Sequence, residues 1–122
     1  MKKIYLLATV IFLISFTAFS LETNTVYKSI SWEEFLFNKD EFLNKDIELK
    51  GYGNAIDNEG FTLVENFESS NSTFVNMVKI KSELKEIILK RYNGKMIMSV
   101  KGRLEYDKTN ERYQIVVDYI MY

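Results

Sequence analysis

The sequence predicts a mainly β protein: a bent five-stranded sheet that closes on itself, in the element order α-β-β-β-α-β-β. Three observations support this fold class. Several short segments alternate apolar and polar residues with a period of two, as half-buried strands do. Glycines at 51, 53 and 102 stand inside two of these segments, where a strand has to bend. One segment, 82–92, instead spaces its apolar residues as one face of a helix.

Residues 1–20 are typical of a cleavable signal peptide. Two lysines precede an apolar run from Ile4 to Phe19, and the small residues Ala18 and Ser20 suit a signal peptidase. We expect cleavage after Ser20, a periplasmic or secreted product, and no stable membrane insertion after cleavage. An uncleaved anchor is the alternative, although the run is shorter than the ~20 apolar residues that span a bilayer. A lipid-modified cysteine is excluded because the chain has 0 cysteines.

The expected folded domain covers residues 30–122, after a loose lead-in at 21–29. Ser31 and Glu34 form a Ser-x-x-Glu capping box, in which each side chain satisfies a free backbone N–H at the start of a helix. Ile30 and Phe35 add a hydrophobic staple across this helix start. We therefore expect a short first helix that ends near residues 38–40.

Three strands are expected next. The first begins at Asp46 and bends at its two glycines, and a turn at 56–60 leads to the second strand, 61–64. After a polar loop, the third strand is expected to run from 74 to 81. In that strand Val78 and Ile80 would face one side, and Lys79 and Lys81 the other.

The second half continues with a helix and two strands. Ser82 is expected to cap the helix, and Asn93-Gly94 to stop it in a left-handed conformation. The fourth strand would place Met96, Met98 and Val100 on one face, bend at Gly102 and end at Tyr106. A hairpin loop at 107–111 then leads to the last strand, 113–122. One face of that strand would carry Tyr113, Ile115, Val117, Tyr119 and Met121.

This order of elements is that of a small β-barrel, the OB-fold, in which the helix between strands three and four closes one end. The required bends fall at the glycines. The alternative is an ordinary antiparallel sheet with one helix on its face.

Two segments carry a family resemblance. Residues 38–51, NKDEFLNKDIELKG, and residues 92–102, YNGKMIMSVKG, resemble the bacterial tRNA_anti-like OB domains of exported proteins. In that family a short helix precedes a strand that ends in glycine, and a Gly-Lys or Gly-Asp turn opens a fourth strand that also ends in glycine. The chain is similar also to periplasmic bacterial OB-fold proteins. The resemblance covers about residues 30–122 and implies a fold, with no catalytic residue to transfer.

Composition excludes most catalytic chemistry. The chain has 0 histidines and 0 cysteines, so it lacks the residues of Ser-His-Asp and Cys-His catalysis and of thiolate or imidazole metal sites. The carboxylate pairs Asp57/Glu59 and Asp107/Glu111 lie in expected turns, where acidic residues bond to the backbone. We therefore expect no enzymatic activity, no cofactor and no metal.

Charge is unevenly distributed along the chain. Residues 22–68 hold 11 acidic and 4 basic side chains, whereas residues 69–122 hold 6 acidic and 10 basic ones. A basic face for an anionic partner is one interpretation. The other is that both sets are solvated and neutralise each other when the chain folds.

The candidate ligand-binding residues follow from the fold. OB-folds bind on the face of strands two and three and between the loops that join strands one to two and four to five. On this basis the candidates are Tyr52, Phe61, Lys79, Lys81, Lys101 and Arg103. The competing interpretation makes the two aromatic residues part of the core and the four cations solvated strand positions.

The function expected from these observations is a non-enzymatic binding or interaction module of the bacterial cell envelope. Its partner would be an envelope protein or a small anionic ligand. The alternative is an oligonucleotide-binding OB-fold protein, which a net acidic mature chain disfavours because it repels polyanions on average.

Overall fold

The computed structural model describes residues 25–91 and 96–122. In chain order the elements are β1 (Lys28–Ser29), α2 (Trp32–Phe37), α3 (Lys39–Phe42), β2 (Asp46–Asn54), β3 (Gly60–Val64), β4 (Ser72–Asn76), α4 (Ser82–Arg91), β5 (Ile97–Asp107) and β6 (Arg112–Met121). The expected signal peptide and the expected Asn93-Gly94 helix stop lie outside the described residues.

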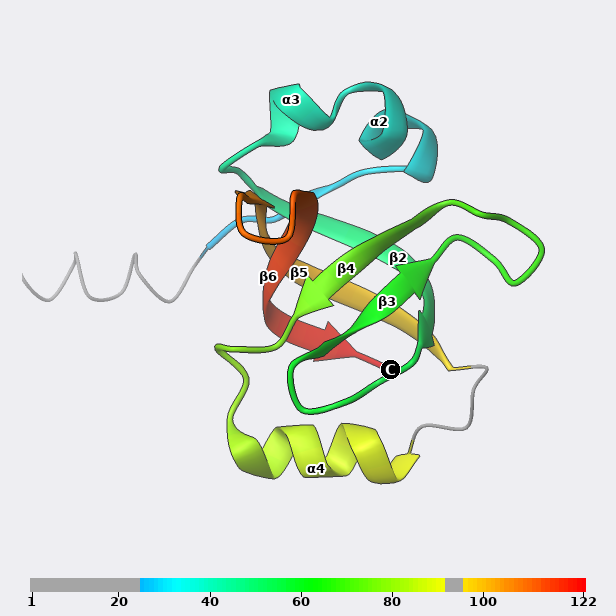
Figure 1. Cartoon of the computed structure of the whole chain (residues 1–122), viewed down its shortest axis with the longest axis vertical. Coiled ribbons are helices and arrows are strands. Elements are labelled where there is room, and N and C mark those ends of the chain that lie inside the picture. Colours follow the sequence, from blue (N-terminus) through cyan, green and yellow to red (C-terminus); the bar gives the residue numbers. More distant parts are fainter. Residues whose placement is uncertain (1–24, 92–95) are drawn as a thin grey trace, which may run out of the picture.

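The strands form a six-stranded sheet that closes in a ring. Its order is β1-β2-β3-β4-β6-β5, and a further pairing of β2 with β5 completes the circuit. The pairs β1–β2 and β4–β6 are parallel and the others antiparallel. Helices α2 and α3 lie at one end of the sheet and α4 at the other (Figure 1). The prediction of a mainly β chain with a sheet that closes on itself is confirmed.

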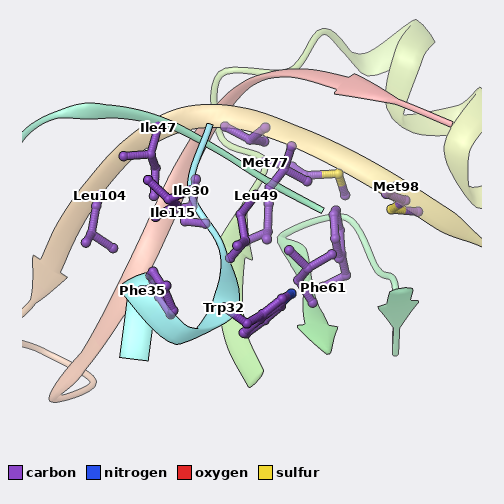
Figure 2. Packing of buried hydrophobic residues seen from close by; sticks show 14 of the residues in the cluster. Ile30, Trp32, Phe35, Ile47, Leu49, Phe61, Met77, Met98, Leu104 and Ile115 are labelled. Atoms are coloured by element: carbon purple, nitrogen blue, oxygen red, sulfur yellow. The ribbon is translucent and has the colours of Figure 1, made fainter. Parts of the chain in front are cut away.

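The core fills the ring with aliphatic, aromatic and methionine side chains (Figure 2). Trp32 and Phe35 of α2 enter it from one end, and Ile88 of α4 belongs to the same cluster. The Trp32 Nε1 donates a 2.6 Å hydrogen bond to the backbone carbonyl of Lys50, so burying the indole leaves its polar atom satisfied. Full burial of a side chain such as Phe35 contributes about 2–3 kcal/mol.

The first helix begins and ends as its sequence predicts. Ser31 and Glu34 form both bonds of the capping box, and α2 ends at its C-cap, Asn38. A second short helix, α3, follows at once and was not expected. This four-residue helix places Phe42 in the core. The contact is tertiary, so local sequence patterns could not predict the helix.

The prediction of a loose lead-in at residues 21–29 is wrong for its last two residues. Lys28 and Ser29 pair with Ile47 and Glu48 as the short parallel strand β1. The neighbouring Ile30 N–H extends this pairing by donating to the Glu48 carbonyl at 3.0 Å. A buried Ile30 therefore fixes the chain to β2 ahead of the first helix.

The third strand is shorter than predicted. β4 ends at Asn76, whose Oδ1 accepts the Val78 N–H at 2.9 Å, and such a side-chain bond turns the backbone away from the strand ladder. Val78 is 69% exposed while Ile80 is buried, so the expected common face of these two residues does not exist. Lys79 lies in the turn, and α4 begins one residue earlier than expected, at Ser82.

The bend at Gly102 is confirmed, and the last strand bends opposite it. Lys101 pairs with Tyr119 and Gly102 with Val117, so Asp118 is an extra residue in β6. An extra residue reverses the alternation of faces beyond it. Ile115 and Val117, predicted on one face, are both buried, but Tyr119, predicted on that same face, is exposed and Ile120 packs against the core instead.

Candidate functional site

A groove runs over the outer side of the ring where β4 lies beside β6. It consists of two adjoining hollows of about 370 and 420 Å³ that share Phe74 and Arg112 as lining residues. The loop between β2 and β3 and the loop between β5 and β6 both reach the first hollow, through Glu59 and Asn110 respectively. We call these two hollows the β4–β6 groove.

Strand pairing brings the shared residues of the groove together. Thr73 and Val75 of β4 are buried, as is Met77 directly after the strand, so Phe74 and Asn76 face outward between them. Parallel pairing sets Phe74 opposite Gln114 of β6.

Arg112 covers the exposed part of Phe74. Its guanidinium carbon lies 3.8 Å from the centre of the Phe74 ring, within cation–π distance. The contact holds a cation against an aromatic face at the middle of the groove, where it can meet a carboxylate or phosphate of a ligand.

Two amide side chains follow Phe74 and Arg112 along the groove. The Nδ2 of Asn76 donates to the Oε1 of Gln114 at 3.3 Å. Each amide keeps further donor and acceptor capacity, since an amide has two N–H groups and two lone pairs. The pair can therefore bond to peptide groups or to other neutral polar ligands.

The carboxylates of the two loops organise their own turns. The Oδ1 of Asp57 accepts the backbone N–H groups of Glu59 and Gly60. Asp107 accepts two backbone N–H groups and the Asn110 side-chain amide, and the last of these is the main cause of its lowered pKa. Both groups thus fix loops that border the groove.

The second hollow ends at a tyrosine next to α3. The Tyr113 hydroxyl donates a 2.7 Å hydrogen bond to Oδ1 of Asp40, and this bond is the main cause of the raised pKa of Tyr113. The Nζ of Lys39 lies 5.3 Å from the centre of the Tyr113 ring. This end of the groove therefore combines a cation with an aromatic ring.

The two aromatic candidates from the sequence do not line the groove. Phe61 is 1% exposed and belongs to the core, as the competing interpretation had it. Tyr52 is half-buried, and its ring contacts that of Phe67 with 5.0 Å between centres. Neither residue is among those lining the two hollows.

The four candidate cations are spread over other parts of the fold. Lys101 lies 3.6 Å from Glu48 on the β2–β5 side of the ring, and Arg103 pairs there with Asp46 in the strand register. Lys81 is exposed directly before α4.

Lys79 and Lys101 both contact one small network around Tyr27. The Tyr27 hydroxyl donates a 2.8 Å hydrogen bond to Oδ2 of Asp118, whose Oδ1 lies 3.6 Å from the Lys79 Nζ. The Lys101 Nζ lies 6.0 Å from the Tyr27 ring centre. Burial first, and the Asp118 carboxylate second, raise the pKa of Tyr27 above its ordinary value. These cations are thus held by carboxylates of the chain itself.

Phe74 and Arg112 were missed because their local signals point elsewhere. A phenylalanine in an apolar strand is usually a core residue, and the expected strand 74–81 had the wrong faces. Thr73, Val75 and Met77 alternate with Phe74 and Asn76. This alternation could have predicted that Phe74 faces outward. Arg112 follows a hairpin loop, and only the parallel β4–β6 pairing brings it over Phe74.

No group of three or more carboxylate, histidine or cysteine residues suited to a metal occurs within residues 25–91 and 96–122. In the same ranges, no helix has the length and apolar character needed to cross a bilayer.

The strand order and the place of the groove define an OB-fold-like protein, and solved structures agree with this class. The chain is similar to the OBody AM1L10 bound to hen egg-white lysozyme, with a TM-score of 0.57, 13% identity, and 80% of this chain and 95% of that chain covered. The chain is also similar to the OBody AM3L15 bound to hen egg-white lysozyme, with a TM-score of 0.57 and 12% identity. This match covers 80% of this chain and 94% of that chain.

A third solved structure is described as an aspartyl-tRNA synthetase from Leishmania major Friedlin. Here the TM-score is 0.56 and the identity 13%, and the match covers 80% of this chain but only 21% of that chain. At such identities these likenesses show the fold alone. No protein-family model matches the sequence, and the search of curated proteins finds no match.

Proposed function

We propose that this chain is a non-enzymatic binding module of the bacterial cell envelope, an exported OB-fold barrel of the tRNA_anti-like type whose partner binds in the β4–β6 groove. The observation that carries the proposal is the groove itself, which both loops border and which contains an arginine stacked on an outward-facing phenylalanine. Export rests on the signal-like residues 1–20.

The side chains of the groove favour a protein partner. In the first hollow two cations, Lys85 and Arg112, stand with two carboxylates, Glu59 and Asp107. A surface of balanced charge with amide side chains suits the mixed donors, acceptors and charges of a polypeptide. The OBody structures, which share this fold, are bound to a protein.

Photo-crosslinking tests this proposal. The full chain is produced in bacterial cells with p-benzoyl-phenylalanine in place of Thr62, which lines the second hollow. The matched control carries it in place of Lys50, an exposed residue of β2 that lines neither hollow. We expect a discrete protein adduct from position 62 and none from position 50. The same adducts from both positions, or none from either, would contradict the proposal.

Export has a separate test. N-terminal sequencing of the protein recovered from the periplasm or the medium should give Leu21 as the first residue. A product that still begins with Met1 would contradict the cleaved form.

The second candidate function is oligonucleotide binding, and the Arg112–Phe74 pair favours it. Cations and aromatic rings together bind the phosphates and bases of single strands. Titration of the full chain with a fluorescent dodecathymidylate at 50 and 200 mM salt separates the candidates. Tight binding that weakens steeply with salt supports this alternative, and the protein-partner proposal predicts weak binding at both concentrations.

A further inference from the structure

In the second half of β6, one edge pairs with no other strand of residues 25–91 and 96–122. β4 pairs with β6 only as far as the Asn76–Val116 pair, because the chain then turns toward α4. From Val117 to Met121, β6 pairs within the described part of the chain only with β5, on its other edge. An edge of this kind presents backbone N–H and C=O groups to an incoming strand.

An apolar hollow lies between this part of β6 and α4. It measures about 140 Å³ and is lined by Leu84 and Ile88 of α4 together with Tyr119, Ile120 and Tyr122 at the C-terminal end of the chain. Leu84 and Tyr119 are 49% and 62% exposed. Apolar cavities of about 150 Å³ accept a ligand of benzene size, so one aliphatic side chain fits. The hollow shares no lining residue with the β4–β6 groove.

Two cations flank the apolar residues of α4. Lys81 directly precedes the helix, and its carbonyl accepts the N–H of Lys85, while Arg91 is the last helical residue. Lys81 stands three residues before Leu84 and Arg91 three residues after Ile88, a spacing that at the helical period brings all four to one side. Ten positions at the helical rise separate the two cations by about 15 Å along the axis. Neither forms an ion pair with another described residue, whereas the one carboxylate of the hollow, Asp118, is paired with Lys79.

We propose that this surface binds an extended acidic peptide segment, which adds as a strand to the free edge of β6. One apolar side chain of the segment enters the hollow, and carboxylates two residues to either side reach Lys81 and Arg91. In an extended chain, residues four apart are about 13 Å apart and point to the same face, which matches the spacing of the two cations. The backbone edge, the apolar hollow and the charge thus all fit one occupant.

The probe is a fluorescein-labelled Glu-Thr-Leu-Thr-Glu peptide, titrated against the full chain and followed by fluorescence anisotropy. We expect saturable binding that weakens at least tenfold in Leu84→Asp and in Arg91→Glu. The matched controls are Phe37→Asp, another exposed apolar residue, on α2, and Lys90→Glu, the same charge change one residue away. Both controls should stay within twofold of the unmodified protein. If Leu84→Asp does not fold, the affinity of Arg91→Glu for the peptide alone tests the proposal.

Strand addition has a readout of its own. N-methylation of alternate peptide amides, on odd or on even residues, should weaken binding about fivefold or more in one of the two sets, because each lost hydrogen bond contributes about 1 kcal/mol. The proposal is overturned by any of three results: no saturable binding, equal binding of Lys-Thr-Leu-Thr-Lys, or equal binding of both methylated sets. Binding to phosphatidylglycerol vesicles without binding to the peptide would also overturn it and indicate a lipid surface.

Discussion

The hydroxyl of Tyr27 donates a 2.8 Å hydrogen bond to the Asp118 carboxylate across 91 residues of sequence. The bond fixes the segment before β1 to the extra residue of the β6 bulge. It thereby joins the beginning of the described domain to its last strand. Two consequences can be measured.

Replacing Tyr27 with phenylalanine should lower the free energy of unfolding by about 1–2 kcal/mol. The Asp118 carboxylate, which is only partly buried, loses its hydroxyl donor, and the loss therefore lies toward the lower end of the roughly 1.5–3 kcal/mol that hydrogen bonds to charged groups contribute. Denaturant unfolding followed by the fluorescence of Trp32, the only tryptophan, measures the change. Tyr119→Phe is the matched control, because Tyr119 packs its ring on that of Tyr27 and is 62% exposed. An equal loss in both variants would contradict the role given to the hydrogen bond.

The same bond predicts a loss of stability in alkaline solution. Burial and Asp118 raise the pKa of Tyr27 above its ordinary value of 10.0, so above pH 10 the unfolded chain loses this proton before the folded one does. Below pH 10 the contribution is complete, and it falls as the pH rises further, by at most about 1.4 kcal/mol per pH unit. Denaturant unfolding is measured from pH 9 to 11.5 in both proteins. The free energy of unfolding should fall more steeply with pH in the unmodified protein than in Tyr27→Phe. Parallel pH profiles would exclude the predicted shift.

The bend of β5 allows a test on its glycine. A Cβ on Gly102 would lie 2.3 Å from the carbonyl oxygen of Val116 and 2.7 Å from the Cα of Val117, and neither backbone atom can move alone. We expect Gly102→Ala to cost about 3 kcal/mol, at the upper end of overpacking effects.

Gly53→Ala is the control for this substitution. There the contacts under 3.0 Å are with the end of the Met98 side chain, at 2.8–2.9 Å, and this flexible end can rotate away. Thermal unfolding should show a clearly larger drop for Gly102 than for Gly53. Equal drops would mean that the close backbone approach at Gly102 does not determine the effect.

Local sequence patterns predicted the parts of the fold that local physics determines. The Ser31–Glu34 capping box, the alternation in β2 and the bend at Gly102 each depend on residues close in sequence or on backbone freedom. β1, α3 and the end of β4 depend on distant contacts, such as Ile30 with β2 and Phe42 with the core. They could not be read from a local period.

The groove overlaps the predicted site location only in part. The prediction placed the site on strands two and three and between two loops, whereas the groove lies between the third and fifth predicted strands, β4 and β6, with both loops at its border. The named aromatic residue Phe61 faces the core, and Lys101 lies beside Glu48 on another side of the ring. A one-residue error in the facing of a strand exchanges its inner and outer residues. Such an error explains why Phe61, which faces the core, was named as a candidate, while Phe74, which faces outward, was not.

The central claim is that β4 and β6 lie side by side and so form the groove. Because the chain has no cysteine of its own, the pair Phe74→Cys/Gln114→Cys can be oxidised in an otherwise unchanged protein. These positions are direct partners in the strand register, about 4.8 Å apart, which is within disulfide range. The control pair is Phe74→Cys/Glu105→Cys, in which Glu105 lies one strand further, opposite Gln114.

Mass spectrometry under mild oxidation measures the disulfide yield in both pairs. The structure predicts a nearly complete intramolecular disulfide between positions 74 and 114, with native Trp32 fluorescence, and little between 74 and 105, which are about 9.5 Å apart. Equal yields in the two pairs, or no disulfide between 74 and 114, would contradict the closed ring and the groove with it.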